Sequence, residues 1–264
     1  MNNNKNDIWL EYNVADSLQP NKEASTIELY TEAAYTQKVM ELLDKHLKKG
    51  YRVLDIGCGI GKWVLYLLKK GIDCIGIDTS EAAVEKAQQI LLKNGYDHVI
   101  FKHSATELPF DRGQFDAIIS FGLLEHFPNH EEVLKYWTAF LKPGGKIIIS
   151  VPNGLRWDWM FSDTLFKWYK QKSRLKPRFT NRGFVSNNYG YEERWRPDYL
   201  ARLFSWAELS KIEITTFFTL SPFIFYSLGK ARVPSFIFRL ISSTRASKRW
   251  GLYLFGVARK QPGE

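Results

Sequence analysis

The chain has 264 residues, a formal net charge of +9 and two cysteines, Cys58 and Cys74. This length suits one large α/β domain with insertions, and the two cysteines form neither a metal-binding nor a redox pattern, which argues against a disulfide scaffold. The polar start, Met1–Asp7, contains no apolar signal region, and no apolar run reaches the ~18 residues of a membrane span. We therefore expect a cytoplasmic protein.

Strand-like and helix-like segments alternate from residue 35 to residue 153, which predicts a parallel sheet with helices on both faces. Thr79 and Ser80 are candidate N-caps for the helix after the second strand. Pro143-Gly144-Gly145 predicts a turn into the fifth strand. The expected strands are 51–56, 73–77, 98–103, 115–121 and 146–151, and the expected helices are 30–48, 61–70, 80–94 and 130–141.

The second part of the chain differs in charge and in pattern. Residues 1–154 hold 17 basic and 20 acidic side chains, whereas residues 155–264 hold 20 basic and 8 acidic ones. Residues 154–195 are also dense in aromatic side chains, helical periodicity returns at 197–209, and strand-like runs follow at 211–220 and 251–259. The basic excess indicates an anionic partner for this part: a phosphate-bearing substrate, a membrane surface or nucleic acid.

A glycine turn follows the first strand. Val53 to Trp63 read as an apolar run with one acid, then three glycines at every second position, then the start of a helix. Such a turn brings bare backbone and a helix N-terminus against a small ligand. Asp78 ends the next strand, where a carboxylate suits ribose hydroxyls. The third glycine of a dinucleotide fingerprint is replaced by Lys62, so a nucleoside ligand other than a dinucleotide is indicated.

The stretch 53–63 resembles the first motif of the class I S-adenosylmethionine-dependent methyltransferases, in the subgroup of small-molecule enzymes known as methyltransferase type 11. Four later segments resemble the remaining motifs of that family in the family's order: 75–80, 102–110, 115–126 and 141–153. The resemblance covers roughly residues 35–153 and says little about either end.

The resemblance implies a Rossmann-like, seven-stranded, mostly parallel sheet with an antiparallel last strand. The Rossmann-like core would span 31–153, and 196–264 would complete its sheet around a second insertion at 221–250. Residues 1–30 and 154–195 would form a lid over the substrate, with Trp9 and Tyr12 as candidates for closing over the cofactor.

The implied cofactor is S-adenosyl-L-methionine. By resemblance, the turn after the first strand faces its methionine part, Asp78 accepts from the ribose hydroxyls, and the segments after the third and fourth strands flank the adenine ring and the cofactor. The expected cofactor-binding residues are Asp55, Gly57, Cys58, Gly59, Asp78, Thr79, Ala105, Thr106, Glu107, Phe121 and Leu124.

His126 is the candidate catalytic residue. Where the acceptor is a hydroxyl, a base can help to remove its proton, and histidine side chains change protonation near neutral pH. The alternative is that His126 packs against or caps the following segment. No metal is expected: some ubiquinone-type O-methyltransferases use a Glu-x-x-Glu-His run here, but Gly122 replaces its first Glu, and Pro128 interrupts a helix that would align His126 with His130.

The expected activity is methyl transfer to a small or amphiphilic acceptor, to oxygen or nitrogen rather than carbon, by in-line displacement. The aromatic and basic insertion suits an amphiphile with an anionic head or peripheral contact with an anionic membrane; it could also pack simply as a lid, and nucleic acid is the least favoured partner. The alternatives are a nicotinamide-dependent oxidoreductase and a non-catalytic module for membrane or protein binding. The sequence does not indicate an oligomeric state.

Overall fold

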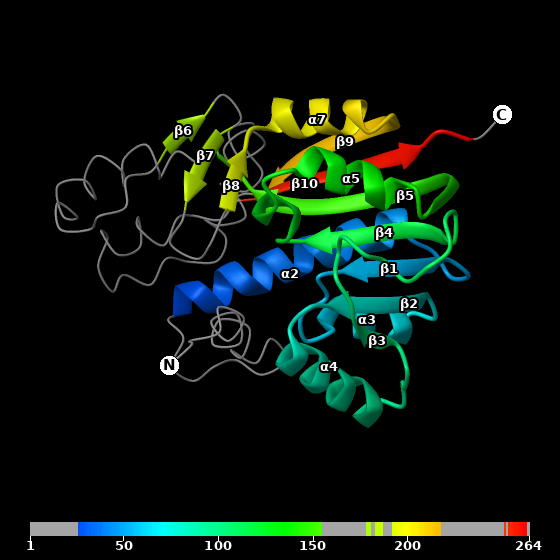
Figure 1. The fold of residues 1–264 in the computed structure, drawn as a ribbon. Helices are drawn as coiled ribbons and strands as arrows, with labels where there is room; N and C mark the ends of the chain where they lie inside the picture. Colours follow the sequence, from blue (N-terminus) through cyan, green and yellow to red (C-terminus); the bar gives the residue numbers. More distant parts are fainter. Residues whose placement is uncertain are drawn as a thin grey trace, which may run out of the picture.

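The computed structural model describes residues 26–154, 178–180, 183–186, 192–217, 251 and 253–262. A seven-stranded sheet runs through them in the order β3-β2-β1-β4-β5-β10-β9 (Figure 1). The strands β1 to β5 are parallel, and β10 pairs in antiparallel fashion with β5 and β9. The expected fold class is confirmed. The strands are β1 Arg52–Ile56, β2 Asp73–Asp78, β3 Ile100–Lys102, β4 Phe115–Phe121, β5 Leu141–Pro152, β9 Leu209–Phe217 and β10 Tyr253–Lys260.

Helices cover both faces of this sheet (Figure 1). Alternate residues of each strand point to opposite faces, so Ile118 packs with α5 and α7 while its neighbour Ile119 packs with α2, α3 and α4. In the part of the chain that the structure describes, no helix combines the length and apolar character needed to cross a membrane. The helices are α2 Thr26–His46, α3 Lys62–Lys69, α4 Glu81–Lys93, α5 His130–Thr138 and α7 Pro197–Trp206.

The start of α4 shows how the local sequence sets a helix boundary. Ser80 is the N-cap of α4, because its side chain accepts a hydrogen bond from the amide of Ala83 at 3.3 Å. Thr79, the other candidate, lies one residue before the cap and is exposed. The helix therefore begins directly after the turn that follows Asp78, which holds that carboxylate at a fixed place on the edge of the sheet.

The expected turn at 143–145 requires a correction. These residues lie inside β5, where the pairing with β4 moves from Phe115–Leu141 to Ala117–Lys146, so that β5 advances five residues while β4 advances two. Gly144 has a φ of +76°, a conformation that glycine adopts without strain. The Pro-Gly-Gly segment thus forms a bulge within the strand rather than a turn before it.

A second, three-stranded antiparallel sheet was not predicted. It consists of β6 Arg178–Thr180, β7 Gly183–Ser186 and β8 Glu192–Trp195, and strands of three or four residues are too short to show a recognisable alternation. Trp195 joins this sheet to the end of β5, since its carbonyl accepts from the amide of Gly154 at 2.8 Å. The rest of the expected lid, with Trp9 and Tyr12, lies outside the described residues, and so does the second insertion at 221–250.

Candidate functional site

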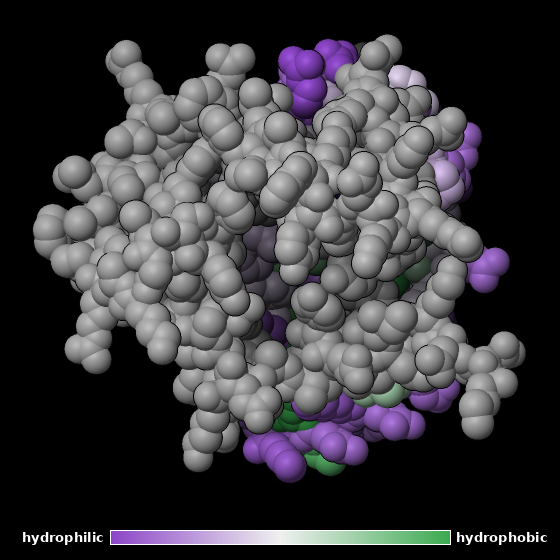
Figure 2. Space-filling view, turned by 90° about the vertical axis from the view of Figure 1, so that its left-hand side faces the viewer, coloured by the Kyte–Doolittle hydropathy of each residue, from purple (hydrophilic) through white to green (hydrophobic). Residues whose placement is uncertain are grey.

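The candidate site lies at the carboxyl ends of β1, β2 and β4. The sheet order places β1 and β4 side by side, with the chain continuing outward from β1 to β2 and from β4 to β5. Open α/β sheets bind ligands at such a point, where the strand order reverses. Figure 2 looks onto this edge of the molecule, and most of the coloured, described residues at its rim are hydrophilic.

The glycine turn joins β1 to α3 by a tight backbone path. The amides of Gly57 and Cys58 donate to the carbonyl of Ile77 at 2.9 and 3.0 Å, which ties the turn to β2. Gly59 has a φ of +52°, and no atom of the described residues lies within 4 Å of the place where a side chain would begin. The described part of the chain therefore leaves its backbone uncovered, as a turn that receives a ligand requires.

Asp78 fixes the other side of the same turn. Its Oδ2 accepts from the amide of Gly59 and its Oδ1 accepts from the amide of Ser80, both at 2.9 Å. Each carboxylate oxygen can accept a further hydrogen bond. The two backbone contacts thus orient a carboxylate that retains the capacity to accept from two hydroxyl groups.

Asp55 is the most unusual ionisable group of the site. It is 1% exposed, and its Oδ2 has no hydrogen-bond partner among the described residues. Burial raises the pKa of the Asp55 carboxyl to about 8, and the nearby charge of Asp78 adds to the rise. A buried carboxyl with an unused oxygen is suited to a ligand that brings a positive charge or a hydrogen-bond donor.

The segment after β3 is held by a side chain of the core. The indole Nε1 of Trp137 donates to the carbonyl of Ala105 at 2.7 Å. The hydroxyls of Ser104 and Thr106 lie 2.8 Å apart, and Thr106 and Glu107 are exposed at the edge of the sheet. The hydrogen bond from Trp137 on α5 therefore fixes this loop, and the polar side chains of Thr106 and Glu107 are exposed to solvent.

After β4, the side chains of two consecutive leucines, Leu123 and Leu124, have different surroundings. Leu124 is fully buried and belongs to the core cluster that contains the buried residues of α5 and α7. Leu123 faces the glycine turn instead, since a Cβ on Gly57 would lie 2.8 Å from its Cδ2. Phe121 is half-buried, with its ring edge-on to Trp63 at a centroid distance of 5.7 Å. Of the residues after β4, Leu123 thus lies next to the glycine turn, and sequence reasoning did not name it.

Glu125 and His126 lie on a short 3₁₀-helix, η1, Leu124–His126. His126 is half-buried, whereas Glu125 is 1% exposed and places its Oε1 3.9 Å from the Cβ position of Gly122. Both residues therefore lie at the turn that follows β4. In the described residues, no group of three or more His, Cys, Asp or Glu side chains has an arrangement that could hold a metal ion.

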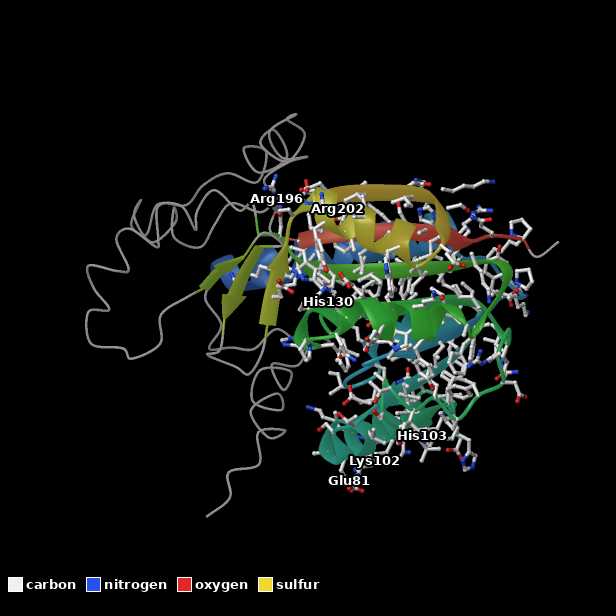
Figure 3. The ribbon with its side chains drawn as sticks, turned by 45° about the horizontal axis from the view of Figure 1, so that its top comes forward. Glu81, Lys102, His103, His130, Arg196 and Arg202 are labelled. Carbon is white, nitrogen blue, oxygen red and sulfur yellow. The ribbon has the colours of Figure 1, made fainter. Side chains whose placement is uncertain are left out.

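His130 belongs to the core rather than to this turn. It lies at the start of α5 (Figure 3), and its ring nitrogens contact the carbonyl of Phe127 at 3.2 Å and the hydroxyl of Tyr199 on α7. The carboxylate of Glu193 on β8 lies 3.7 Å from its Nδ1. His130 thus connects α5, α7 and β8.

Helix α2 brings two further residues to the site, and no motif had indicated them. The hydroxyl of Tyr35 donates to Ser150 Oγ at 3.3 Å, and its ring lies 4.7 Å from that of Tyr253. Burial raises the pKa of Tyr35 above its usual range, and the nearby carboxylates of Glu125 and Asp55 act in the same direction. The Tyr35 hydroxyl therefore stays protonated. It lies near Asp55 at the end of β1 and near Glu125 on η1.

The next residue of α2 reaches the opposite side of the turn. The Thr36 hydroxyl accepts a hydrogen bond from Lys62 Nζ at 2.7 Å. Lys62 is the first residue of α3, and its ammonium lies 5.1 Å from the centre of the Trp63 ring. Successive residues of α2 thus contact β5 on one side of the site and α3 on the other.

These residues fit a nucleoside joined to a charged chain. Within the described residues, Asp78 can accept from ribose hydroxyls, the backbone at Gly59 is uncovered, and the Asp55 oxygen without a partner suits an ammonium group. S-adenosylmethionine combines these three features, because it carries a ribose, an α-amino group and a positively charged sulfonium.

The comparisons with known proteins agree with that fit. A family model described as a methyltransferase domain matches residues 27–189. The ubiquinone biosynthesis O-methyltransferase of Dechloromonas aromatica is 30% identical over 199 residues, which cover 73% of this chain and 78% of that protein. The demethylmenaquinone methyltransferase of Bacillus subtilis is 32% identical over 129 residues, 47% of this chain and 54% of that protein.

A solved structure shows a similar fold. The S-adenosylmethionine-dependent methyltransferase of Thermotoga maritima, described as a possible histamine N-methyltransferase, superimposes with a TM-score of 0.56 at 19% identity, covering 87% of this chain and 89% of that one. The chain therefore belongs to the methyltransferase-domain family and is an S-adenosylmethionine-dependent methyltransferase. This finding favours methyl transfer over the nicotinamide-dependent alternative.

Proposed function

We propose that the chain methylates a hydroxyl group on the ring of a small aromatic molecule of the quinol type. The observation that carries this proposal is the set of partly exposed aromatic rings at the carboxyl ends of β4 and β5: Phe121 at the end of β4, Tyr253 paired with the end of β5, and Tyr35 in contact with Tyr253. Glu125 and His126 lie on η1, which follows β4. Such rings suit a flat acceptor, which can stack on them. Two relatives, one named ubiquinone biosynthesis O-methyltransferase and the other demethylmenaquinone methyltransferase, support an acceptor of the quinone type.

Cofactor binding is proposed to use the two acids and the glycine turn. Asp78 would accept from the ribose, Asp55 would face the amino group, and Gly57, Cys58 and Gly59 would supply the backbone between them. Thr79, Ala105, Thr106 and Glu107 would border the base, with Phe121 and Leu123 on the other side. We place Leu123 here in preference to Leu124, because the side chain of Leu124 is buried in the core.

The methyl group on a sulfonium is already activated, so the chain has to align the acceptor oxygen and exclude water. His126 is proposed to take the hydroxyl proton, since it lies at the turn after β4 and is partly exposed. Glu125 lies beside it and is almost fully buried, which suits it to orient the acceptor hydroxyl rather than to exchange protons with solvent.

The proposal is tested by transfer of a radiolabelled methyl group to catechol and to alkylated hydroquinones, with primary aliphatic amines as the matched control. We expect label in a methyl ether that resists acid, and no label in the amines. Label on the amines, or on a ring carbon of the hydroquinones, would contradict methyl transfer to oxygen. The cytoplasmic location and the expected contact with an anionic membrane stay predictions; salt-sensitive sedimentation with anionic vesicles tests the contact.

A further inference from the structure

Two basic residues face each other across the main sheet, far from the candidate site. Lys146, just after the bulge in β5, pairs directly with Arg259 near the end of β10. Because β10 runs antiparallel to β5, its last residues lie at the amino ends of the parallel strands, opposite to the candidate site (Figure 1). Directly paired side chains lie on the same face of a sheet, and like charges in such a pair are destabilising. A negative charge between the two would remove this cost.

The end of α2 brings a further cation to the same place. The Nζ of Lys146 donates to the carbonyl of His46, the last residue of α2, and Lys146 is only 8% exposed. Lys48 follows the helix, and its Nζ lies 5.3 Å from the centre of the Tyr51 ring. The Nζ of Lys146 lies 5.9 Å from the centre of that ring. Two ammonium groups therefore share one aromatic ring beside Arg259.

Glu213 on β9 is the acidic side chain nearest to these cations among the described residues. Its Oε2 accepts from Lys45 Nζ at 2.6 Å, so its charge is already paired. Burial lowers the pKa of Lys146, and the positive charge of Arg259 is the next cause. In the described part of the chain, no carboxylate forms an ion pair with Lys48, Lys146 or Arg259. These three residues, the basic cluster, are thus left with an excess of positive charge.

We propose that the basic cluster of Lys48, Lys146 and Arg259 binds a phosphate group. The planar guanidinium of arginine matches two phosphate oxygens at once, and lysine ammonium groups act as point charges beside it. A phosphate group carries up to two negative charges and several acceptor oxygens, so it can contact three cations together. A carboxylate has one charge and two oxygens and would compensate fewer of them. The proposed site is separate from the cofactor site and does not depend on the methyl acceptor.

A structural role at the end of α2 is the competing explanation. Cations are favourable near the C-terminus of a helix, where they interact with the last carbonyls and with the helix dipole. This accounts for Lys146 and Lys48, but not for Arg259, which lies on β10. The two explanations differ for Arg259. A structural role predicts that its loss lowers stability with or without phosphate, whereas a phosphate site predicts that its loss removes the response to phosphate.

The test is thermal unfolding at rising concentrations of inorganic phosphate, with sodium chloride adjusted to hold the ionic strength constant. We expect phosphate to raise the Tm of the wild-type chain by about 2 °C or more and to saturate. Arg259→Gln should leave the Tm without phosphate within about 1 °C, as surface substitutions do, and should need about tenfold more phosphate for half of the effect. Lys48→Gln should need about threefold more. Lys146 is kept intact, because its loss would also remove a cap from α2.

Lys93→Gln is the matched control, because Lys93 is also an exposed lysine in the last turn of a helix, α4. It should respond to phosphate as the wild-type chain does. Binding of S-adenosylhomocysteine should be equal in all four proteins, which separates the basic cluster from the cofactor site.

Sedimentation with phosphatidylcholine vesicles that contain phosphatidic acid distinguishes two sources of the phosphate group. Vesicle binding that Arg259→Gln weakens indicates a lipid head group. Absent vesicle binding, or binding that this variant leaves unchanged, together with the expected phosphate response, indicates dissolved phosphate. Equal responses of the wild-type chain and Arg259→Gln to both phosphate and vesicles would overturn the proposal, and so would the absence of any response in the wild-type chain.

Discussion

The amide of Gly59 donates to Oδ2 of Asp78 at 2.9 Å, so the turn after the first strand and the end of the second strand form one unit. Gly59 is thus held by the same carboxylate that is proposed to accept from the ribose. Cofactor binding and the conformation of the turn are therefore coupled through a single side chain. Substitutions of Asp78 should affect both.

We expect Asp78→Ala to weaken binding of S-adenosylhomocysteine by about 1.5–3 kcal/mol, the range for hydrogen bonds to a charged group. Asp78→Asn should cost less, because the amide oxygen can still accept from Gly59. Calorimetry measures both affinities. Asp73→Asn is the control, since Asp73 starts the same strand and is exposed at its opposite end. Unchanged affinity in Asp78→Ala would remove Asp78 from the site.

The buried carboxyl of Asp55 should make stability depend on pH. Its pKa rises from 3.8 in the unfolded reference to about 8 in the folded chain. Between these values the folded state holds a proton that the unfolded state has released, so the free energy of unfolding falls as pH rises from about 4 to about 8. Urea unfolding at several pH values measures this slope. Asp55→Asn should reduce it, and an identical slope in the variant would contradict the assignment.

The same group should release a proton when the cofactor binds. An ammonium beside Asp55 favours the ionised carboxylate, so binding below about pH 8 is expected to expel up to one proton per site. Calorimetry of S-adenosylhomocysteine in buffers with different ionisation enthalpies counts these protons. A decarboxylated analogue of S-adenosylhomocysteine, in which hydrogen replaces the carboxylate, keeps the amino group and should release the same number. Asp55→Asn should release fewer.

The parts of the fold that sequence analysis predicted well are those with long apolar runs and glycine at their ends. Gly71 and Gly95 directly follow the expected helices 61–70 and 80–94, and both have positive φ values, +73° and +83°, which are typical of a residue after a helix end. The bulge in β5 was missed because Pro-Gly-Gly is typical of turns, whereas here pairing with β4 resumes at Lys146. The β6–β8 sheet was missed because its strands are short.

The site was predicted where its residues are close in sequence and missed where folding brings distant residues together. Asp55, Gly59 and Asp78 belong to recognisable strand ends. Tyr35 and Thr36 lie on a helix that reaches the site only when α2 packs across the sheet, with Tyr35 contacting Ser150, 115 residues away in the chain. Leu123 and Leu124 are adjacent leucines, and only the path of η1 decides which one faces Gly57.

Gly76 should be intolerant of any side chain. A Cβ at this position in β2 would lie 2.7 Å from Ile100 Cδ1 and 2.8 Å from both Cys58 Sγ and Val64 Cγ2. We therefore expect Gly76→Ala to lower the free energy of unfolding by about 1–3 kcal/mol, as overpacking does, and to disturb the turn through Cys58. Urea unfolding measures the loss. Gly95→Asn, at an uncrowded left-handed position, should cost much less, and equal costs would argue against a packing cause.

Trp137 should matter for the cofactor although it lies in the core. Trp137→Phe keeps a ring in place but removes the Nε1 donor to Ala105, leaving that carbonyl without its partner. Losing a buried hydrogen bond costs about 1–3 kcal/mol of stability. The loop with Thr106 and Glu107 should then bind S-adenosylhomocysteine several-fold more weakly. Thr138→Ala, which removes a hydrogen bond within the same helix, is the control for a general loss of stability.

His126 offers the sharpest test of the proposed chemistry. If His126 takes the proton from the acceptor hydroxyl, His126→Asn should lower kcat by about 10²–10⁴-fold, the usual contribution of general base catalysis, and leave the affinity for S-adenosylhomocysteine unchanged. His98→Asn serves as the control, because His98 is exposed and lies before the amino end of β3, at the edge of the sheet opposite to the site. A His126 variant that keeps full turnover on every hydroxyl acceptor would show that methyl transfer proceeds without this base.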